Sequence, residues 1–262
     1  MQLMICLSGD TKQLTYLPEI AALGAGIELG GYGLEGIRSM EAWEQRLALH
    51  RALIERFDGP IAMHAPFIGI EYDHTDCLLR EAIDQRLDLA FRTAVQLGAG
   101  HVIFHGGYRI AYDYFQLQEN WLERAAGYWQ RELPRWVAAG MHVVIENESD
   151  LIPDLLVRLA DAVNHPAFGL CLDIGHQHLF SNVDAPEWVR RMGYRLHHLH
   201  LHDNDRSRDA HWPMGSGTIP FEPFFHAVEE YTTEVTCSLE VQAEMDEKMA
   251  NLRRLAARFA GV

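Results

Sequence analysis

Residues 196–220 of the chain read LHHLHLHDNDRSRDAHWPMGSGTIP and hold five histidines, three aspartates and a Gly-x-Gly turn. At the start of this stretch, leucines 199 and 201 point to one side, and His198, His200 and His202 point to the other. This period of two is typical of a strand. Imidazole and carboxylate groups at a strand end are ligands for zinc, manganese or iron. The stretch therefore predicts a metal site, with a polar, solvated strand end as the alternative.

Seven more short apolar runs share this strand-like character, and helix-patterned segments separate most of the runs. The predicted strands are 3–7, 26–29, 61–64, 101–105, 142–146, 169–173, 196–202 and 236–241. The predicted helices are 39–57, 78–97, 116–139, 151–163, 185–192, 221–230 and 244–260, with a short one at 12–23. Pro134 should end or kink the helix at 116–139.

Eight strands that alternate with helices predict an α/β fold of parallel βαβ units, closed into a (β/α)8 TIM barrel. A doubly wound open sheet is the alternative, and no Gly-x-Gly-x-x-Gly follows the first strand to support it. The sequence contains no linker or low-complexity tract, so residues 1–262 are expected to form a single domain.

The composition limits the kinds of molecule that the protein is expected to bind. The chain has 22 basic and 37 acidic residues and a formal charge of −15, which disfavours binding to nucleic acid. Its four cysteines form no Cys-x-x-Cys pair, which favours reduced thiols and a cytoplasmic location. No signal peptide or membrane-spanning run is expected. A small-molecule substrate is expected, and Trp121, Tyr128 and Trp129 either form a homo-oligomer interface or cover the barrel.

Potential metal ligands stand at the ends of six consecutive predicted strands. In a TIM barrel, the active site lies at the carboxyl ends of the strands. Burying so many charged groups is costly unless cations neutralise them. These residues are His64, His105, Glu146, Asp173 with His176, His200 with His202, and Glu240, and the loop after the seventh strand adds Asp209 and His211.

These residues resemble the xylose isomerase-like TIM barrels of the AP endonuclease 2 family, which include endonuclease IV and many sugar isomerases and epimerases. The resemblance runs from His64 to Glu240 and is most specific in the segments LDIGH, HLHD and DAHWPMGSG. The sequence departs from the family at His202, where Lys or Asn is frequent, and at Ser216, where Glu is frequent.

The resemblance implies one of two ligand sets. The sugar epimerase pattern implies one divalent ion, of zinc, manganese, cobalt or magnesium, bound by Glu146, Asp173, His200 and Glu240. The endonuclease IV pattern implies three zinc ions, with Glu146 shared between two of them. Their ligands would be His64, His105 and Glu146; Asp173, His200 and Glu240; and His176, Asp209 and His211.

Three functions fit this pattern. In the first, the protein is a metal-dependent isomerase or epimerase of a sugar or sugar phosphate, in which Glu146 and Glu240 transfer a proton through an enediolate. In the second, it is a zinc phosphoesterase that acts on an abasic site or a small phosphoester. In the third, the barrel only binds a ligand or partner.

Several residues near the site have open roles. Phe67, His202 and Arg206 are candidates for contacts to substrate. Glu28 either bonds to substrate or supports the structure, and the Gly215-Ser216-Gly217 segment is either an ordinary turn or a backbone contact for phosphate.

Overall fold

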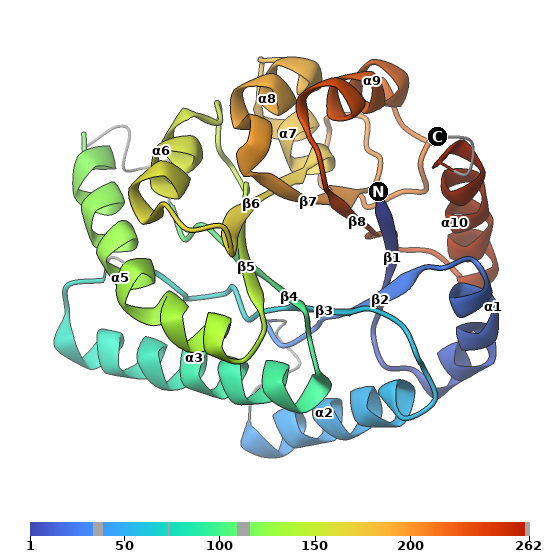
Figure 1. Cartoon of the computed structure of the whole chain (residues 1–262), viewed down its shortest axis with the longest axis horizontal. Coiled ribbons are helices and arrows are strands. Elements are labelled where there is room, and N and C mark those ends of the chain that lie inside the picture. The colour runs from blue at the N-terminus through green and yellow to red at the C-terminus, as the bar shows by residue number, and fades with distance from the viewer. Residues whose placement is uncertain (34–38, 73, 109–115, 260–262) are drawn as a thin grey trace.

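The computed structural model describes residues 1–33, 39–72, 74–108 and 116–259. Eight parallel strands form a closed barrel in which each strand pairs with the next and β8 pairs with β1 (Figure 1). The strands are β1 (Gln2–Leu7), β2 (Gly26–Leu29), β3 (Ile61–His64), β4 (His101–His105), β5 (His142–Glu146), β6 (Phe168–Asp173), β7 (Leu196–Leu201) and β8 (Thr236–Leu239). The predicted TIM barrel is therefore confirmed.

Helices surround the barrel on its outer side (Figure 1). They are η1 (Thr11–Tyr16), α1 (Leu17–Ala22), α2 (Met40–Ile54), α3 (Cys77–Leu97), α5 (Gln118–Ala138), α6 (Asp154–Val163), α7 (Ile174–Phe180), α8 (Ala185–Met192), η2 (Gly193–Arg195), α9 (Phe221–Tyr231) and α10 (Met245–Phe259). Helix α7 was not predicted, because it is short and begins directly at the end of β6. Helix α5 continues through Pro134, so this proline does not end the helix.

The outer core lies between the strands and the helices. Trp121, Tyr128 and Trp129 of α5 are at most 3% exposed, so they cover the barrel and do not form a surface interface. All four cysteines are free thiols. Within the described residues, no helix is both long enough and apolar enough to cross a membrane.

The inner face of the barrel is layered. Neighbouring strands β4 and β5 are paired in register, so that His101 lies beside His142, Ile103 beside Val144, and His105 beside Glu146. Because every second residue of a strand faces the same side, these three pairs stack along the barrel axis. A small apolar cluster fills the middle layer, formed by Met4, Ala62, Ile103, Val144 and Cys171. Polar side chains therefore occupy the two ends of the barrel.

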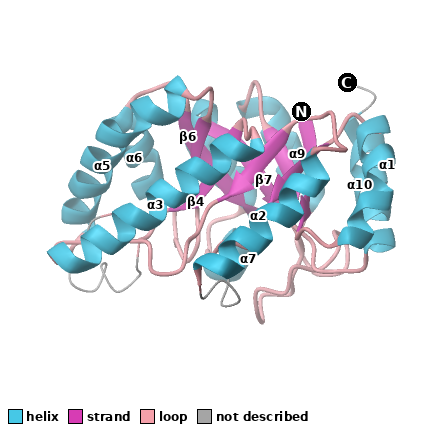
Figure 2. Cartoon of the chain, turned by 90° about the horizontal axis from the view of Figure 1, so that it is seen from below, coloured by secondary structure: helices cyan, strands magenta, loops and turns pink. Residues whose placement is uncertain are grey.

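The carboxyl ends of the strands all face one end of the molecule. Figure 2 shows the amino terminus, which leads into β1, at the upper edge, and α7, which follows β6 directly, at the lower edge. The predicted site residues stand at this lower end, at the carboxyl ends of the strands and in the loops that follow them.

Candidate metal centre

Strand register brings the predicted ligands together. His64, His105, Glu146 and Asp173 are the last residues of β3, β4, β5 and β6. His105 pairs with Glu146, and Asp173 with His200 of β7, so these side chains stand at one height on the barrel wall. Potential ligand atoms form groups in which all atoms lie within 4.8 Å of one another.

Glu146 belongs to two of these groups. Its Oε2 lies 3.1 Å from Nε2 of His64 and 3.4 Å from Nε2 of His105. Its Oε1 lies 3.1 Å from Nδ1 of His200. Glu146 is therefore shared between two groups of potential ligands, and it would contribute to both if each held a cation, as the resemblance implies.

The second group surrounds His200. Its Nδ1 lies 3.1 Å from Glu240 Oε2 and 3.9 Å from Asp173 Oδ2, in addition to the contact with Glu146. His200 and Asp173 are fully buried, whereas the side chain of Glu240 is 27% exposed. The group is thus open to solvent on the side of β8.

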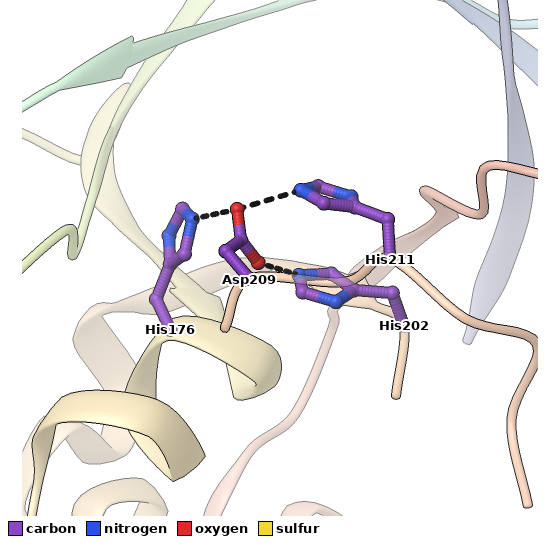
Figure 3. Close-up of side chains that lie close together, drawn as sticks. All are labelled: His176, His202, Asp209 and His211. Atoms are coloured by element: carbon purple, nitrogen blue, oxygen red, sulfur yellow. Dashed lines mark hydrogen bonds and ion pairs between the residues drawn. The ribbon is translucent and has the colours of Figure 1, made fainter. Parts of the chain in front are cut away.

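The third group is carried by the start of α7 and by the loop after β7 (Figure 3). Asp209 Oδ2 lies 3.4 Å from Nε2 of His176 and 2.9 Å from Nε2 of His211. His202 also approaches, with its Nε2 3.8 Å from Asp209 Oδ1. The structure therefore brings together all nine residues that the resemblance implies as ligands.

Hydrogen bonds fix the orientation of the imidazoles. Nδ1 donates to a backbone carbonyl in His64 (Ala65, 3.0 Å), in His176 (Asn147, 3.0 Å) and in His211 (Glu240, 2.8 Å). When such an imidazole is neutral, its Nε2 carries the lone pair, and Nε2 of all three rings faces the cluster. Metal-binding histidines are held in this way, so the residues present fit a metal centre.

His202 is oriented differently. Its Nε2 lies 3.1 Å from both carboxylate oxygens of Asp173, and its Nδ1 is buried without a hydrogen-bond partner. Nε2 therefore donates to Asp173 in this structure, and the same ring belongs to the group with His176, Asp209 and His211 that could hold a metal ion. The ring packs so closely over Gly175 that a Cβ atom there would lie 1.9 Å from it. His202 is fully buried, and its role as a contact to substrate stays a prediction.

Charge interactions decide the protonation of the cluster. Burial lowers the pKa of His64 and His211, but hydrogen bonds to Glu146 and Asp209 outweigh burial and raise each pKa to about 9. Burial raises the pKa of Glu146, but the charges of His200 and His105 outweigh it and hold that pKa well below its usual value. Without a metal, protonated imidazoles thus balance the carboxylates, and a metal ion would displace those protons.

The loop that carries Asp209 and His211 is fastened at its base by Asp203. The buried carboxylate of Asp203 accepts hydrogen bonds from the backbone N–H groups of Asn204, Gly215, Gly217 and Ile219 at 2.9–3.2 Å. The N–H groups of Gly215 and Gly217 are therefore already bonded within the protein. The Gly-Ser-Gly segment is a structural turn, and the alternative of a phosphate contact is not supported.

Glu28 contacts His200 of the cluster from inside the barrel. It is 1% exposed and lies 3.2 Å from Nε2 of both His198 and His200, and Ser238 Oγ donates to it at 2.5 Å. The bond to Nε2 of His200 turns Nδ1 of that ring towards Glu146 and Glu240. A structural role for Glu28, one of the two roles expected from the sequence, agrees with this burial.

A cavity of about 410 Å³ opens beside the cluster. Phe67 lines it and stacks on His105, with ring centroids 4.4 Å apart. Arg206 lies elsewhere: it is exposed, and its backbone N–H donates to Asn204. Two cations that the sequence analysis did not select, Arg46 and Lys248, line the same cavity. Lys248 is one of only two lysines in the chain, which is the signal that could have marked it.

Comparison with known proteins agrees with the fold. Residues 18–258 match the model of the xylose isomerase-like TIM barrel family, AP endonuclease 2, and the chain belongs to this family. The family expected from the sequence is thus confirmed.

Individual relatives are distant. A probable endonuclease 4 of Mycobacterium leprae is 24% identical over 200 residues, which is 72% of this chain and 76% of that protein. Fructoselysine 3-epimerase of Escherichia coli O157:H7 is 24% identical over 229 residues, or 80% and 78% of the two chains. The alignments span 66–78% of the length of the curated relatives.

Solved structures match over nearly the whole chain. The TTHB071 protein of Thermus thermophilus, from a crystal soaked with ZnCl2, is 26% identical with a TM-score of 0.75, covering 98% of this chain and 99% of that one. Several sugar 3-epimerases and a D-tagatose 3-epimerase-like protein also match, at 14–18% identity, and at this distance they show the fold alone.

Proposed function

We propose that the protein is a divalent-metal-dependent isomerase or epimerase of a sugar or sugar phosphate. The observation that carries this proposal is the group of Glu146, Asp173, His200 and Glu240, in which two carboxylates approach Nδ1 of His200 to 3.1 Å. Three carboxylates and one imidazole suit zinc, manganese, cobalt or magnesium. The epimerase relative and the family support a carbohydrate substrate.

The chain's own residues account for proton transfer. A bound divalent ion supplies a Lewis acid that polarises the substrate carbonyl and its neighbouring hydroxyl. Glu146 ends β5 and Glu240 follows β8, and these strands are not neighbours in the barrel. In this proposal the two carboxylates approach a bound sugar from different sides. One removes the proton beside the carbonyl to give an enediolate, and the other returns a proton to the opposite face.

Hydrogen exchange tests this proposal. Metal-loaded protein is incubated in D2O with a panel of sugars and sugar phosphates, and deuterium at the carbon beside the carbonyl is measured by NMR. Glu146→Gln and Glu240→Gln should abolish exchange, whereas Glu187→Gln on exposed α8 should retain it. Metal content is measured in each variant, so that lost proton transfer is distinguished from lost metal. Exchange retained in both site variants would refute the assignment.

A second candidate is a zinc phosphoesterase. It is favoured by the two further groups around His64 and Asp209, because the nine candidate ligands then include five histidines, which suit zinc better than magnesium. The endonuclease relative supports it as well, whereas the charge of −15 weighs against a DNA substrate.

Metal content separates the two candidates. Elemental analysis of protein purified without chelators should give one ion per chain for the isomerase and two or three zinc ions for the phosphoesterase. Zinc-loaded protein is then assayed for cleavage of an abasic-site duplex and of a small phosphodiester. Absence of cleavage at full zinc occupancy would eliminate the second candidate.

A further inference from the structure

We infer that the substrate carries an oxyanion, a phosphate or a carboxylate, remote from its reacting carbon, and that Arg46 and Lys248 bind this group. The inference rests on the proposed function and names the substrate class of the same site. The cavity of about 410 Å³ is lined by His64, His211 and Glu240 of the cluster and by these two cations. A single small molecule can therefore contact both the cluster and the cations.

Arg46 has unused donor capacity. It lies on α2 and is half-buried, and one guanidinium nitrogen donates to the backbone carbonyl of Ser8 at 2.8 Å. It forms no ion pair with a carboxylate of the described residues. Gly31, with a φ of +86°, leaves room for the guanidinium, since a Cβ atom there would lie 2.7 Å from Nη1. A guanidinium has five N–H donors in a fork that matches an oxyanion.

Lys248 is the second cation without a carboxylate partner. It lies on α10, and its Nζ contacts the carbonyl oxygen of Cys6 at 3.4 Å. Among the residues with described positions, none forms an ion pair with it. Burial lowers the pKa of Lys248 and outweighs the opposing charge of Glu240 in the same cavity, so the surroundings still disfavour the ammonium charge. An anionic ligand would supply the missing charge.

The rest of the chain makes this arrangement unusual. With 37 acidic residues against 22 basic ones, carboxylates are plentiful, and exposed arginines on the helices pair with them. Arg158 binds Glu119 through two bonds of 2.7 and 2.9 Å, and Arg190 binds Glu187 through two of 2.6 Å. Two cations that lack such partners in one cavity are what an anionic substrate requires, whereas a neutral sugar would leave both uncompensated.

The size of the cavity agrees with this substrate class. Small-molecule pockets have volumes of roughly 300–1,000 Å³, so about 410 Å³ suits a single sugar with a charged group. Arginine and lysine bind phosphate and carboxylate alike through charge-assisted hydrogen bonds. The cavity therefore defines the shared chemistry, and the experiment distinguishes the two oxyanions.

Calorimetry with matched probes tests the inference. Metal-loaded full-length protein is titrated with D-fructose, D-fructose 6-phosphate and D-glucuronate. Hydrogen bonds to charged groups contribute about 1.5–3 kcal/mol, so an oxyanion probe should bind about tenfold to a hundredfold more tightly than D-fructose. Tighter binding of the phosphate identifies a sugar phosphate, and tighter binding of the uronate identifies a sugar acid.

Substitutions test whether Arg46 and Lys248 cause the preference for an oxyanion. Arg46→Met and Lys248→Met keep the apolar stems, and each should reduce the preference for the oxyanion several-fold. The double variant should bring the ratio of affinities close to one. Lys12→Met, at the other lysine of the chain, and Arg51→Met on the same helix as Arg46 are matched controls that should keep the preference. Thermal unfolding checks that each variant is folded. If the double variant is unfolded, the reduced oxyanion preference of the two single variants tests the inference instead.

Two results would overturn the inference. One is equal affinity of the unmodified protein for charged and neutral probes, and the other is a preference that persists when both cations are replaced. The outcome is independent of catalysis: a preference that depends on the cations without hydrogen exchange on any probe contradicts the proposed function alone. Exchange without such a preference contradicts only the inference.

Discussion

Both ends of the barrel carry clustered histidines, but only one end surrounds them with carboxylates. At the amino end, His101, His142 and His197 line a cavity together with Thr236. Of the residues whose positions are described, no carboxylate forms an ion pair with these three rings. At the carboxyl end, every ring of the candidate metal centre lies within 4 Å of Glu146, Asp173, Asp209 or Glu240.

The difference teaches that fixed negative charge, and not the number of imidazoles, marks the end that can hold cations. Burial lowers the pKa of His101 to about 4, so this ring is neutral at pH 7. His64 is more deeply buried, yet Glu146 raises its pKa to about 9. The same side chain thus takes opposite charge states at the two ends of one barrel.

The largest expected effect comes from removing the shared carboxylate. Glu146→Gln should lower zinc affinity by about a hundredfold or more, because it removes a ligand from two groups at once, and even partners outside the ligand set cost 10–100-fold. Competition with a chromogenic chelator measures the affinity. His142→Gln, on the same strand but at the amino end, is the matched control and should leave zinc affinity unchanged. Equal losses in both variants would mean that the two ends do not differ as described.

A smaller loss is expected from Glu28, which does not face the ligand groups directly. Glu28→Gln keeps the shape of the side chain but weakens the hydrogen bond that orients His200. Zinc affinity should fall by about 10–100-fold, with little change in the number of ions bound at saturation. Glu247→Gln, on exposed α10, serves as the control. Unchanged zinc affinity in Glu28→Gln would show that His200 is oriented by its other contacts.

Two glycines, each packed against a histidine ring at one end of the barrel, allow the two ends to be compared by adding a methyl group. A Cβ atom at Gly175 would lie 1.9 Å from the ring of His202, and one at Gly169 would lie 2.2 Å from the ring of His197. Overpacking of this kind costs about 1–3 kcal/mol of folding free energy. Gly175→Ala should cost more, because His202 is fully buried and His197 is not. Only Gly175→Ala should also weaken zinc binding. Denaturant unfolding measures the loss of stability, and competition with a chelator measures zinc affinity. Equal zinc affinities in the two variants would contradict the prediction.

The smallest effect concerns pH. In metal-free protein the pKa of His64 and His211 is raised from 6.5 to about 9, so the folded state holds these protons more tightly than the unfolded chain does. Their stabilising contribution is complete below about pH 6.5 and is lost as the pH rises to about 9. Zinc binding should strengthen over the same interval, because fewer protons must be displaced. Thermal stability should therefore fall between about pH 6.5 and 9 without zinc and stay nearly level with zinc; parallel slopes would contradict this.

The sequence predicted the barrel and the strand-end positions of the candidate ligands, because both follow from the period of the strands, whereas the division of these residues into ligand groups was implied by the resemblance to the family. A residue at the carboxyl end of a parallel strand has its position set by the sheet, so His64, His105 and Glu146 could be placed together before the structure was known. Their role as ligands remains a prediction. The helices were harder: α7 is shorter than the patterns that identify helices reliably.

Other features of the site could not be predicted, because they depend on packing between elements. Arg46 and Lys248 come from helices α2 and α10, and the rotation of each helix against the barrel decides whether these cations face the cavity. The sequence pattern placed His202 in line with His198 and His200, and only the structure shows the contact of its ring with both carboxylate oxygens of Asp173. Arg206, expected near the substrate, lies on the exposed part of its loop.

The attachment of the loop after β7 has a consequence for how this protein can change. Asp203 holds both sides of the loop through backbone hydrogen bonds, which do not depend on the identity of the side chains that they join. Residues 205–208 form an exposed tip above this anchor. Mutations in the tip can therefore accumulate, or be introduced by selection in the laboratory, with the ligands kept in place.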